Sequence, residues 1–160
     1  MSLELLSPAF SSGGAIPEEH SKDGGNNSPP LVWSDTPETT RSFALIVDDP
    51  DAPSGVFVHW LLYDIPSTAA GVESRMPRVE ELPDGSRQGT NGFGDLGYGG
   101  PRPPSGTHRY FFHLYGLDDV LDLEPGEDRE ALERAMKGHI LEEAELMGTY
   151  QHREPGTQAA

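Results

Sequence analysis

Short apolar runs separated by glycine- and proline-rich segments predict a protein made mainly of β-strands. The strongest runs cover residues 41–47, 56–65 and 109–117, which carry many β-branched and aromatic side chains. Two weaker runs, residues 3–6 and 31–33, are predicted to be short strands. Both faces of the segment 56–65 are mostly apolar, so we expect this strand to lie in the middle of a sheet.

Alternation along the strands assigns side chains to faces. Residues 56–65 place five side chains on one face: Phe57, His59, Leu61, Tyr63 and Ile65. In the segment 109–117 and the residue before it, His108 and Tyr110 lie on one face, and Arg109 and His113 lie on the other. A histidine and a tyrosine two residues apart therefore point the same way.

The pattern changes near the C-terminus. Apolar residues recur at intervals of three and four from Leu132 to Ile140, which is typical of an amphipathic helix. The segment 142–147 is expected to add a further helical turn or two that ends at Gly148. We expect one domain over residues 1–150, and a flexible tail over residues 151–160.

Glycine and proline are frequent between residues 66 and 106, so most of this segment is predicted to form loops. Long loops in a compact domain are usually functional. Two turn-rich stretches, residues 48–55 and 99–107, each lie beside a predicted strand that carries a histidine. These stretches are the strongest candidates for a binding site.

The charge excludes several classes of partner. The 160 residues include 27 acidic and 11 basic side chains, for a formal net charge of −16. Such a surface repels phosphate backbones and anionic lipids, so we expect no nucleic-acid binding and no stable membrane association. Two interpretations of the acidity remain open: an ordinary acidic protein, or one adapted to a cytoplasm of molar salt, as in a halophilic archaeon.

The location in the cell is predicted from features that the sequence lacks. It contains no cysteine, and its longest apolar run, residues 43–47, is far shorter than the ~20 residues of a membrane span. The first residues have neither a basic region nor an apolar segment typical of a signal peptide. We therefore expect a cytoplasmic protein.

Three carboxylates lie in the first turn-rich stretch. Asp48, Asp49 and Asp51 follow a buried strand, and Pro50 and Pro53 stiffen the backbone around them. Each aspartate alone is most simply explained as an acceptor for turn N–H groups. Three carboxylates within four positions repel one another unless something binds them, so the run as a whole favours a site.

The second stretch offers groups suited to an anion. Gly99, Gly100 and Gly106 allow backbone N–H groups to approach a ligand, and His108 and Tyr110 follow on one strand face. His59 by itself is most simply a core residue. The other histidines have no such surroundings and are interpreted as structural or surface residues: His20, His113, His139 and His152.

These motifs resemble the phosphatidylethanolamine-binding protein family, in its prokaryotic Raf-kinase-inhibitor-like branch. The similarity rests on D-P-D-A-P at residues 49–53, a following strand histidine, and G-x-x-x-x-x-G-x-H-R-Y at residues 100–110. It implies a mostly β fold of two packed antiparallel sheets, with short C-terminal helices and long loops. It also implies an anion pocket formed by Asp49, Asp51, Pro53, His59, Gly100, Pro101, His108 and Tyr110.

The resemblance further implies a cis peptide bond before Pro53. The chain departs from the animal members of the family in two places. Arg102 follows Pro101, and we expect its side chain to face solvent. The C-terminal segment that lines the pocket in animal members is short here, and Tyr150 is a candidate to replace its tyrosine.

We therefore expect a small-ligand binding protein that recognises phosphate or a phosphorylated headgroup, with no catalytic residue, no cofactor and no metal. Two alternatives remain. One is an enzyme in which Asp49, His59 and His108 form a metal triad or an acid–base pair. The other is a regulator whose pocket binds a protein partner, such as a kinase or a protease.

Overall fold

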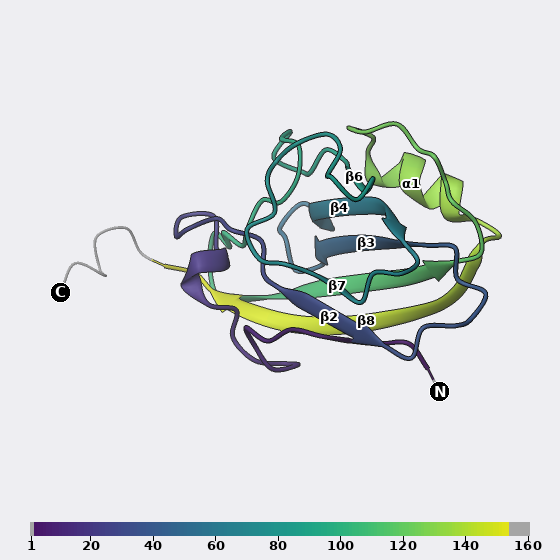
Figure 1. The fold of residues 1–160 in the computed structure, drawn as a ribbon. Helices are drawn as coiled ribbons and strands as arrows, with labels where there is room; N and C mark the ends of the chain where they lie inside the picture. The colour runs from purple at the N-terminus through teal and green to yellow at the C-terminus, as the bar shows by residue number, and fades with distance from the viewer. Residues whose placement is uncertain (1, 154–160) are drawn as a thin grey trace.

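The structure, a computed structural model, describes residues 2–153 and consists mainly of two antiparallel β-sheets (Figure 1). The larger sheet has the strand order β6-β4-β3-β7-β8 and the smaller has the order β1-β2-β5. The larger contains β3 (Ser42–Asp49), β4 (Phe57–Pro66), β6 (Arg87–Gln88), β7 (Thr107–Leu117) and β8 (Ile140–Gln151), and the smaller contains β1 (Glu4–Leu6), β2 (Leu31–Ser34) and β5 (Gly71–Val72). The expected mostly β fold of two sheets is confirmed.

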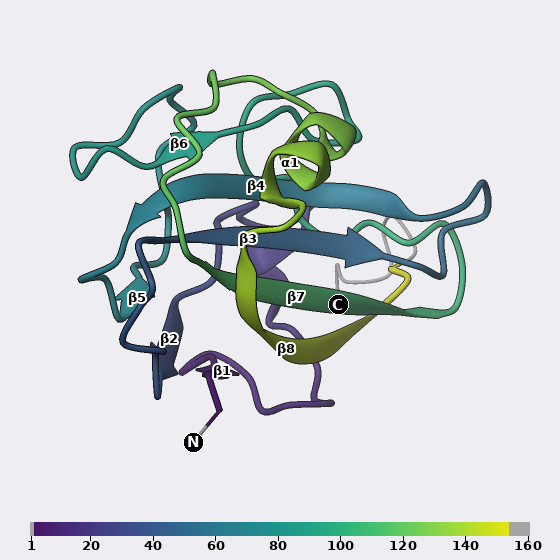
Figure 2. The ribbon, with the colours of Figure 1, turned by 90° about the vertical axis from the view of Figure 1, so that its right-hand side faces the viewer.

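Each face of the larger sheet is covered by a different layer. On one face the small sheet contributes Leu5 and Trp33 to a core that also contains Phe43 and Phe112. On the other face lies α1 (Arg129–Met136), which lies in front of β4 in Figure 2. Its Leu132 is fully buried in this second core. A one-turn 3-10 helix, η1 (Glu18–His20), lies in the long loop after β1.

The C-terminal segment differs from the prediction. The helix ends at Met136, and Gly138 follows in the left-handed region at φ +86°. Residues 140–151 then form strand β8, which pairs with β7 along almost its whole length. The prediction of further helical turns at residues 142–147 was therefore wrong. Burial in this segment has the two-residue period of a strand. Every second residue is buried, namely Ala144, Leu146, Gly148 and Tyr150.

Strand β4 departs from strict alternation at two bulges. Val47 pairs with Trp60 and Asp48 pairs with Val58, which leaves His59 as an extra residue opposite β3. A second irregularity lies near Asp64, whose φ is +53°. The five side chains assigned to one face are therefore divided, because Leu61 and Tyr63 face α1 whereas Ile65 faces the small sheet.

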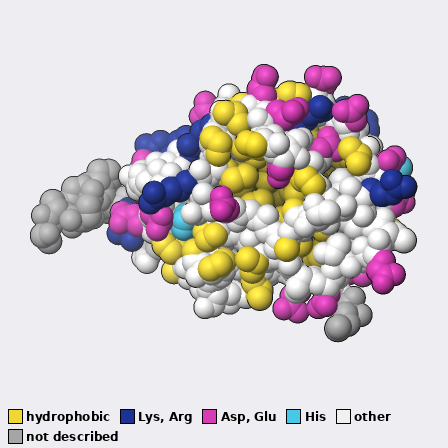
Figure 3. All heavy atoms as spheres, in the orientation of Figure 1, with side chains coloured by type: hydrophobic (Ala, Val, Ile, Leu, Met, Phe, Trp, Pro, Cys, Tyr) yellow, Lys and Arg dark blue, Asp and Glu magenta, His cyan; other side chains and the backbone are white. Residues whose placement is uncertain are grey.

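The surface in Figure 3 carries hydrophobic side chains across its middle and acidic side chains at several places around its rim. Within residues 2–153 no helix is long and apolar enough to cross a membrane. Strand β8 extends to Gln151, which is the first residue of the segment predicted to be a flexible tail. Residues 154–160 of that tail lie outside the described part of the chain.

Candidate ligand-binding pocket

A cavity of about 280 Å³ lies where β3 ends and where β4 and β7 begin. The two turn-rich stretches of the sequence meet here, because β3 pairs with both β4 and β7. Five of the eight predicted pocket residues line the cavity: Asp49, Pro53, His59, His108 and Tyr110. Sequence positions 59 residues apart are thus brought into one site by strand pairing.

Asp49 and His108 form a buried pair in this pocket. The Nδ1 atom of His108 lies 2.6 Å from Oδ2 of Asp49, and both side chains are almost fully buried. The second carboxylate oxygen of Asp49 accepts the backbone N–H of Asp51 at 2.8 Å. Asp49 therefore orients the imidazole and holds the turn, and it leaves Nε2 of His108 as the nitrogen available to a ligand.

The bulge in β4 sets the position of His59. Its Nδ1 atom lies 2.6 Å from the carbonyl oxygen of Gly99, an acceptor that requires a proton on Nδ1. Burial lowers the pKa of His59, despite the opposing effects of this carbonyl and of Asp49. At neutral pH His59 is therefore uncharged, and its Nε2 atom is a hydrogen-bond acceptor.

Tyr110 completes the polar part of the pocket. Its ring lies 5.2 Å from that of His59 in an edge arrangement, and 6.5 Å from that of His108 in a stacked one. Its hydroxyl is buried and makes no hydrogen bond within the protein. Burial, together with nearby Asp49, raises the pKa of the phenol well above its usual range, so the hydroxyl keeps its proton.

Three predicted pocket residues lie outside the lining of this cavity. Asp51 directs its carboxylate to Arg109, which binds it with both the backbone N–H and the guanidinium. Gly100 donates its N–H to the side chain of Asn26 at 2.8 Å, and Pro101 lies in the neighbouring cavity. Two of the three glycine N–H groups expected to bind an anion are thus already used, because that of Gly99 donates to the carbonyl oxygen of His59.

The peptide bond before Pro53 is trans, as are all peptide bonds in the described residues. The expected cis bond is therefore wrong for this structure. The turn that contains Pro53 instead reverses through Gly55, which has a φ of +116° that few other residues adopt. The carboxylate of Asp49 also stabilises this turn, through the N–H of Asp51.

Several lining residues were not predicted. Phe57 and Phe93 meet edge to face, with ring centroids 4.7 Å apart, and they provide an aromatic wall beside His59. Phe57 could have been found, because it lies two residues before His59 on the same strand. Phe93 lies between glycines in an irregular loop, where no periodic pattern marks it.

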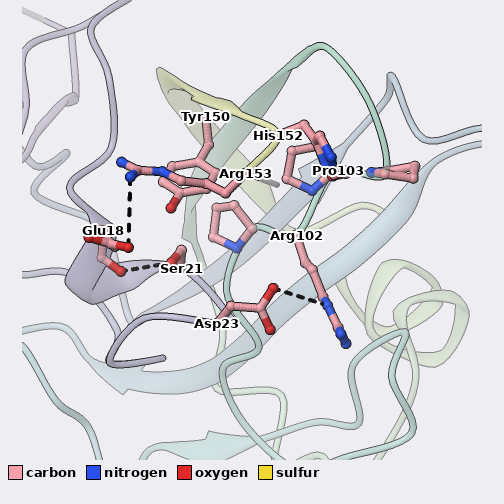
Figure 4. Close-up of a pocket in the computed structure, with 10 residues that line it drawn as sticks. Glu18, Ser21, Asp23, Arg102, Pro103, Tyr150, His152 and Arg153 are labelled. Atoms are coloured by element: carbon pink, nitrogen blue, oxygen red, sulfur yellow. Dashed lines mark hydrogen bonds and ion pairs between the residues drawn. The ribbon is translucent and has the colours of Figure 1, made fainter. Parts of the chain in front are cut away.

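Arg102 lies at the rim of the pocket and also lines a second, larger cavity of about 530 Å³. Figure 4 shows this neighbour, in which Arg102 binds Asp23 at 3.2 Å and Arg153 binds Glu18 at 3.8 Å. Residues 102–104 line both cavities, so they form the wall between them. Arg102 thus faces the pocket mouth as well as solvent, whereas Tyr150 lines the second cavity and not the first.

The pocket does not bring metal ligands together. Asp49, the carboxylate of the alternative metal triad, uses both oxygens in hydrogen bonds within the protein, to His108 and to the backbone N–H of Asp51. Within residues 2–153, the histidine and carboxylate ligand atoms that lie close enough to share an ion are on β7 and β8 and not in the pocket. The pocket geometry is better suited to a small ligand held by hydrogen bonds.

Comparison with known proteins gives one consistent result. The sequence model of the phosphatidylethanolamine-binding protein family matches residues 6–151. A UPF0098 protein of Methanothermobacter thermautotrophicus is 53% identical over 148 residues, which cover 92% of this chain and 98% of that protein. A UPF0098 protein of Aquifex aeolicus is 46% identical over 92% of this chain and 88% of its own length.

Two solved structures share the fold. The Chlamydia trachomatis protein CT736, described as a homologue of phosphatidylethanolamine-binding protein, matches with a TM-score of 0.87 and 40% identity. That match covers 95% of this chain and 99% of CT736. Escherichia coli YbcL, described as a member of the same mammalian family, matches with a TM-score of 0.88 and 30% identity, over 96% of this chain and all of YbcL.

Proposed function

Because the chain belongs to the phosphatidylethanolamine-binding protein family, we propose that its pocket binds a small phosphate-type anion and catalyses no reaction of its own. The observation that carries this proposal is the meeting of His59, His108 and Tyr110 in one cavity with an arginine at its rim. The cavity is close to the lower limit of typical small-ligand sites, which suits a headgroup-sized molecule.

The polar groups of the pocket contribute in different ways to ligand binding. Nε2 of His108 is the ring nitrogen that faces a ligand, because Nδ1 is bound to the carboxylate of Asp49. Neutral His59 offers an acceptor, which suits a ligand that still carries a proton, such as a phosphate monoanion. Arg102 adds a positive charge at the mouth of the pocket.

The apolar groups limit what else can enter. Phe57, Phe93, Pro103 and Pro104 surround the polar groups and keep bulk water away from them. A less polar environment strengthens hydrogen bonds to a bound anion. These walls also provide contact area for a short carbon chain attached to the phosphate.

The experiment is a titration of the full chain with inorganic phosphate and with O-phosphoethanolamine, followed by phosphorus NMR and calorimetry at pH 6 and pH 8. We expect binding at pH 6 that weakens toward pH 8, because a phosphate group loses within this range the proton that Nε2 of His59 accepts. Tighter binding of O-phosphoethanolamine would show that the carbon chain and amine contribute.

Matched variants make the test specific. Arg102→Gln should weaken phosphate binding about tenfold, the equivalent of 1.4 kcal/mol. Arg153→Gln, which removes a charge from the second cavity alone, should leave binding unchanged. Absence of binding at pH 6, or equal losses in both variants, would count against the proposal.

A further inference from the structure

A second group of ionisable side chains lies on the face of the large sheet opposite the pocket. Strand pairing places His113 on β7 directly across from Glu145 on β8, and Glu143 lies two residues away on the same face. The three side chains offer ligand atoms that all lie within 4.8 Å of one another. From its sequence surroundings alone, His113 was expected to be a structural or surface residue.

The contacts of His113 with these two glutamates are ion pairs and not hydrogen bonds. Nδ1 of His113 lies 3.4 Å from a carboxylate oxygen of Glu143 and 3.6 Å from one of Glu145. This nitrogen is buried, yet it makes no hydrogen bond in the structure. Its nearest polar neighbours are the two carboxylates at ion-pair distance, so a positive charge, either a proton on Nδ1 or a metal ion, is expected between them.

The same distances suit a shared metal ion. Zinc binds histidine nitrogen and carboxylate oxygen at 2.0–2.2 Å in a tetrahedral arrangement, and neighbouring ligand atoms are then about 3.3–3.6 Å apart. Both separations from Nδ1 fall at or near this range. The two glutamate side chains are about half exposed, so an ion could enter from solvent and keep a water ligand.

The other ring nitrogen of His113 is already oriented by a carboxylate. Nε2 lies 3.3 Å from Oδ1 of Asp48, which is buried, and Arg129 binds the second oxygen of Asp48 at 2.8 Å. A carboxylate behind a histidine fixes its tautomer and strengthens it as a metal ligand.

We propose that His113, Glu143 and Glu145 bind a divalent transition-metal ion such as Zn²⁺, with Asp48 and Arg129 supporting the histidine from behind. The ion links β7 to β8 on the outer face of the sheet. The site is separate from the pocket, because consecutive residues of β3 point to opposite faces: Asp48 toward the metal ligands and Asp49 toward the pocket. The net charge of −16 also favours cations at this surface.

The test is calorimetric titration of the chelator-treated full chain with Zn²⁺, accompanied by the visible spectrum of the Co²⁺-loaded protein. We expect one ion per chain and the intense absorption of tetrahedral cobalt. Glu143→Gln and Glu145→Gln should each weaken Zn²⁺ binding at least about tenfold, because even supporting residues of metal sites contribute 10–100-fold. Both glutamates are partly exposed, so these variants should fold normally, as their melting without metal will show.

Three control variants separate this site from other sources of binding. Glu130→Gln removes an equal charge from the exposed surface of α1 and should not change the affinity. His139→Gln removes a histidine that faces a single carboxylate, and His108→Gln tests the pocket. The proposal is overturned by an absence of Zn²⁺ binding, by unchanged affinity in Glu143→Gln, or by loss of binding in one of these controls.

Discussion

The unpartnered hydroxyl of Tyr110 allows a sharp test of the pocket. Burial of a hydroxyl without a hydrogen bond costs about 1–3 kcal/mol in proteins. Tyr110→Phe removes that group and keeps the ring, which is 1% exposed and packed against His59. We therefore expect the free energy of unfolding of the ligand-free protein to rise by about 1 kcal/mol or more.

Tyr98→Phe is the matched comparison. The hydroxyl of Tyr98 donates to the carbonyl oxygen of His20 at 2.6 Å, and its side chain is equally buried. Its removal leaves a buried carbonyl without a partner, so we expect a loss of about 1–3 kcal/mol. The same chemical change should therefore have opposite signs at Tyr110 and Tyr98.

The assay is thermal and urea unfolding of both variants, combined with phosphate titration. For a domain of this size 1 kcal/mol shifts Tm by about 2–4 °C, which is easily measured. Tyr110→Phe should also weaken phosphate binding about tenfold, because a hydrogen bond to a charged group contributes about 1.5–3 kcal/mol. If Tyr110→Phe lowers Tm as Tyr98→Phe does, the hydroxyl is bonded within the protein, for example to Asp49, and the reasoning is refuted.

Other predictions concern pH, packing and salt. The hydrogen bonds from Arg109 lower the pKa of Asp51 to about 2 from 3.8. The pair should therefore stabilise the fold above about pH 4 and lose this effect as the pH falls toward 2. In Arg109→Gln the urea midpoint of unfolding should change less with pH over this range. Leu146→Ala should cost about 2–5 kcal/mol in denaturant unfolding because Leu146 is 1% exposed, whereas Leu141→Ala, at a position 36% exposed, should cost much less. Raising salt toward 1 M should increase Tm by screening the acidic surface, and a Tm that does not rise would remove the interpretation of adaptation to molar salt.

The sequence predicted those parts of the fold where burial follows a simple period. The central strands and the shared face of His108 and Tyr110 could be placed because alternation is regular there. The resemblance of the two motifs to a known family supplied the packing of the sheets. The alternation of apolar and polar residues could not predict which distant side chains bond to each other, as Asp51 and Arg109 do.

The errors have physical reasons. Residues 140–151 contain leucine, methionine and glutamate, which favour helices when isolated, but pairing with β7 overrides this preference. His59 could not be placed by alternation, because a bulge shifts the register at that residue. Phe93 reaches the pocket from an irregular loop, so its place depends on tertiary contacts alone.

Strand β8 also determines what a nascent or shortened chain would expose. It is synthesised after the other strands and helices of residues 2–153, and until it pairs with β7 the outer edge of that eleven-residue strand has no partner. A proteolytic product or premature termination that removes residues 140–151 would leave an aromatic strand edge open to association with other chains. In the finished protein β8 covers this edge with a strand whose exposed face carries glutamates, and residues 13–16 pair with the far side of β8. The C-terminal strand therefore covers an edge that would otherwise be open to aggregation. We expect cellular chaperones and proteases to act most strongly on products that lack this strand.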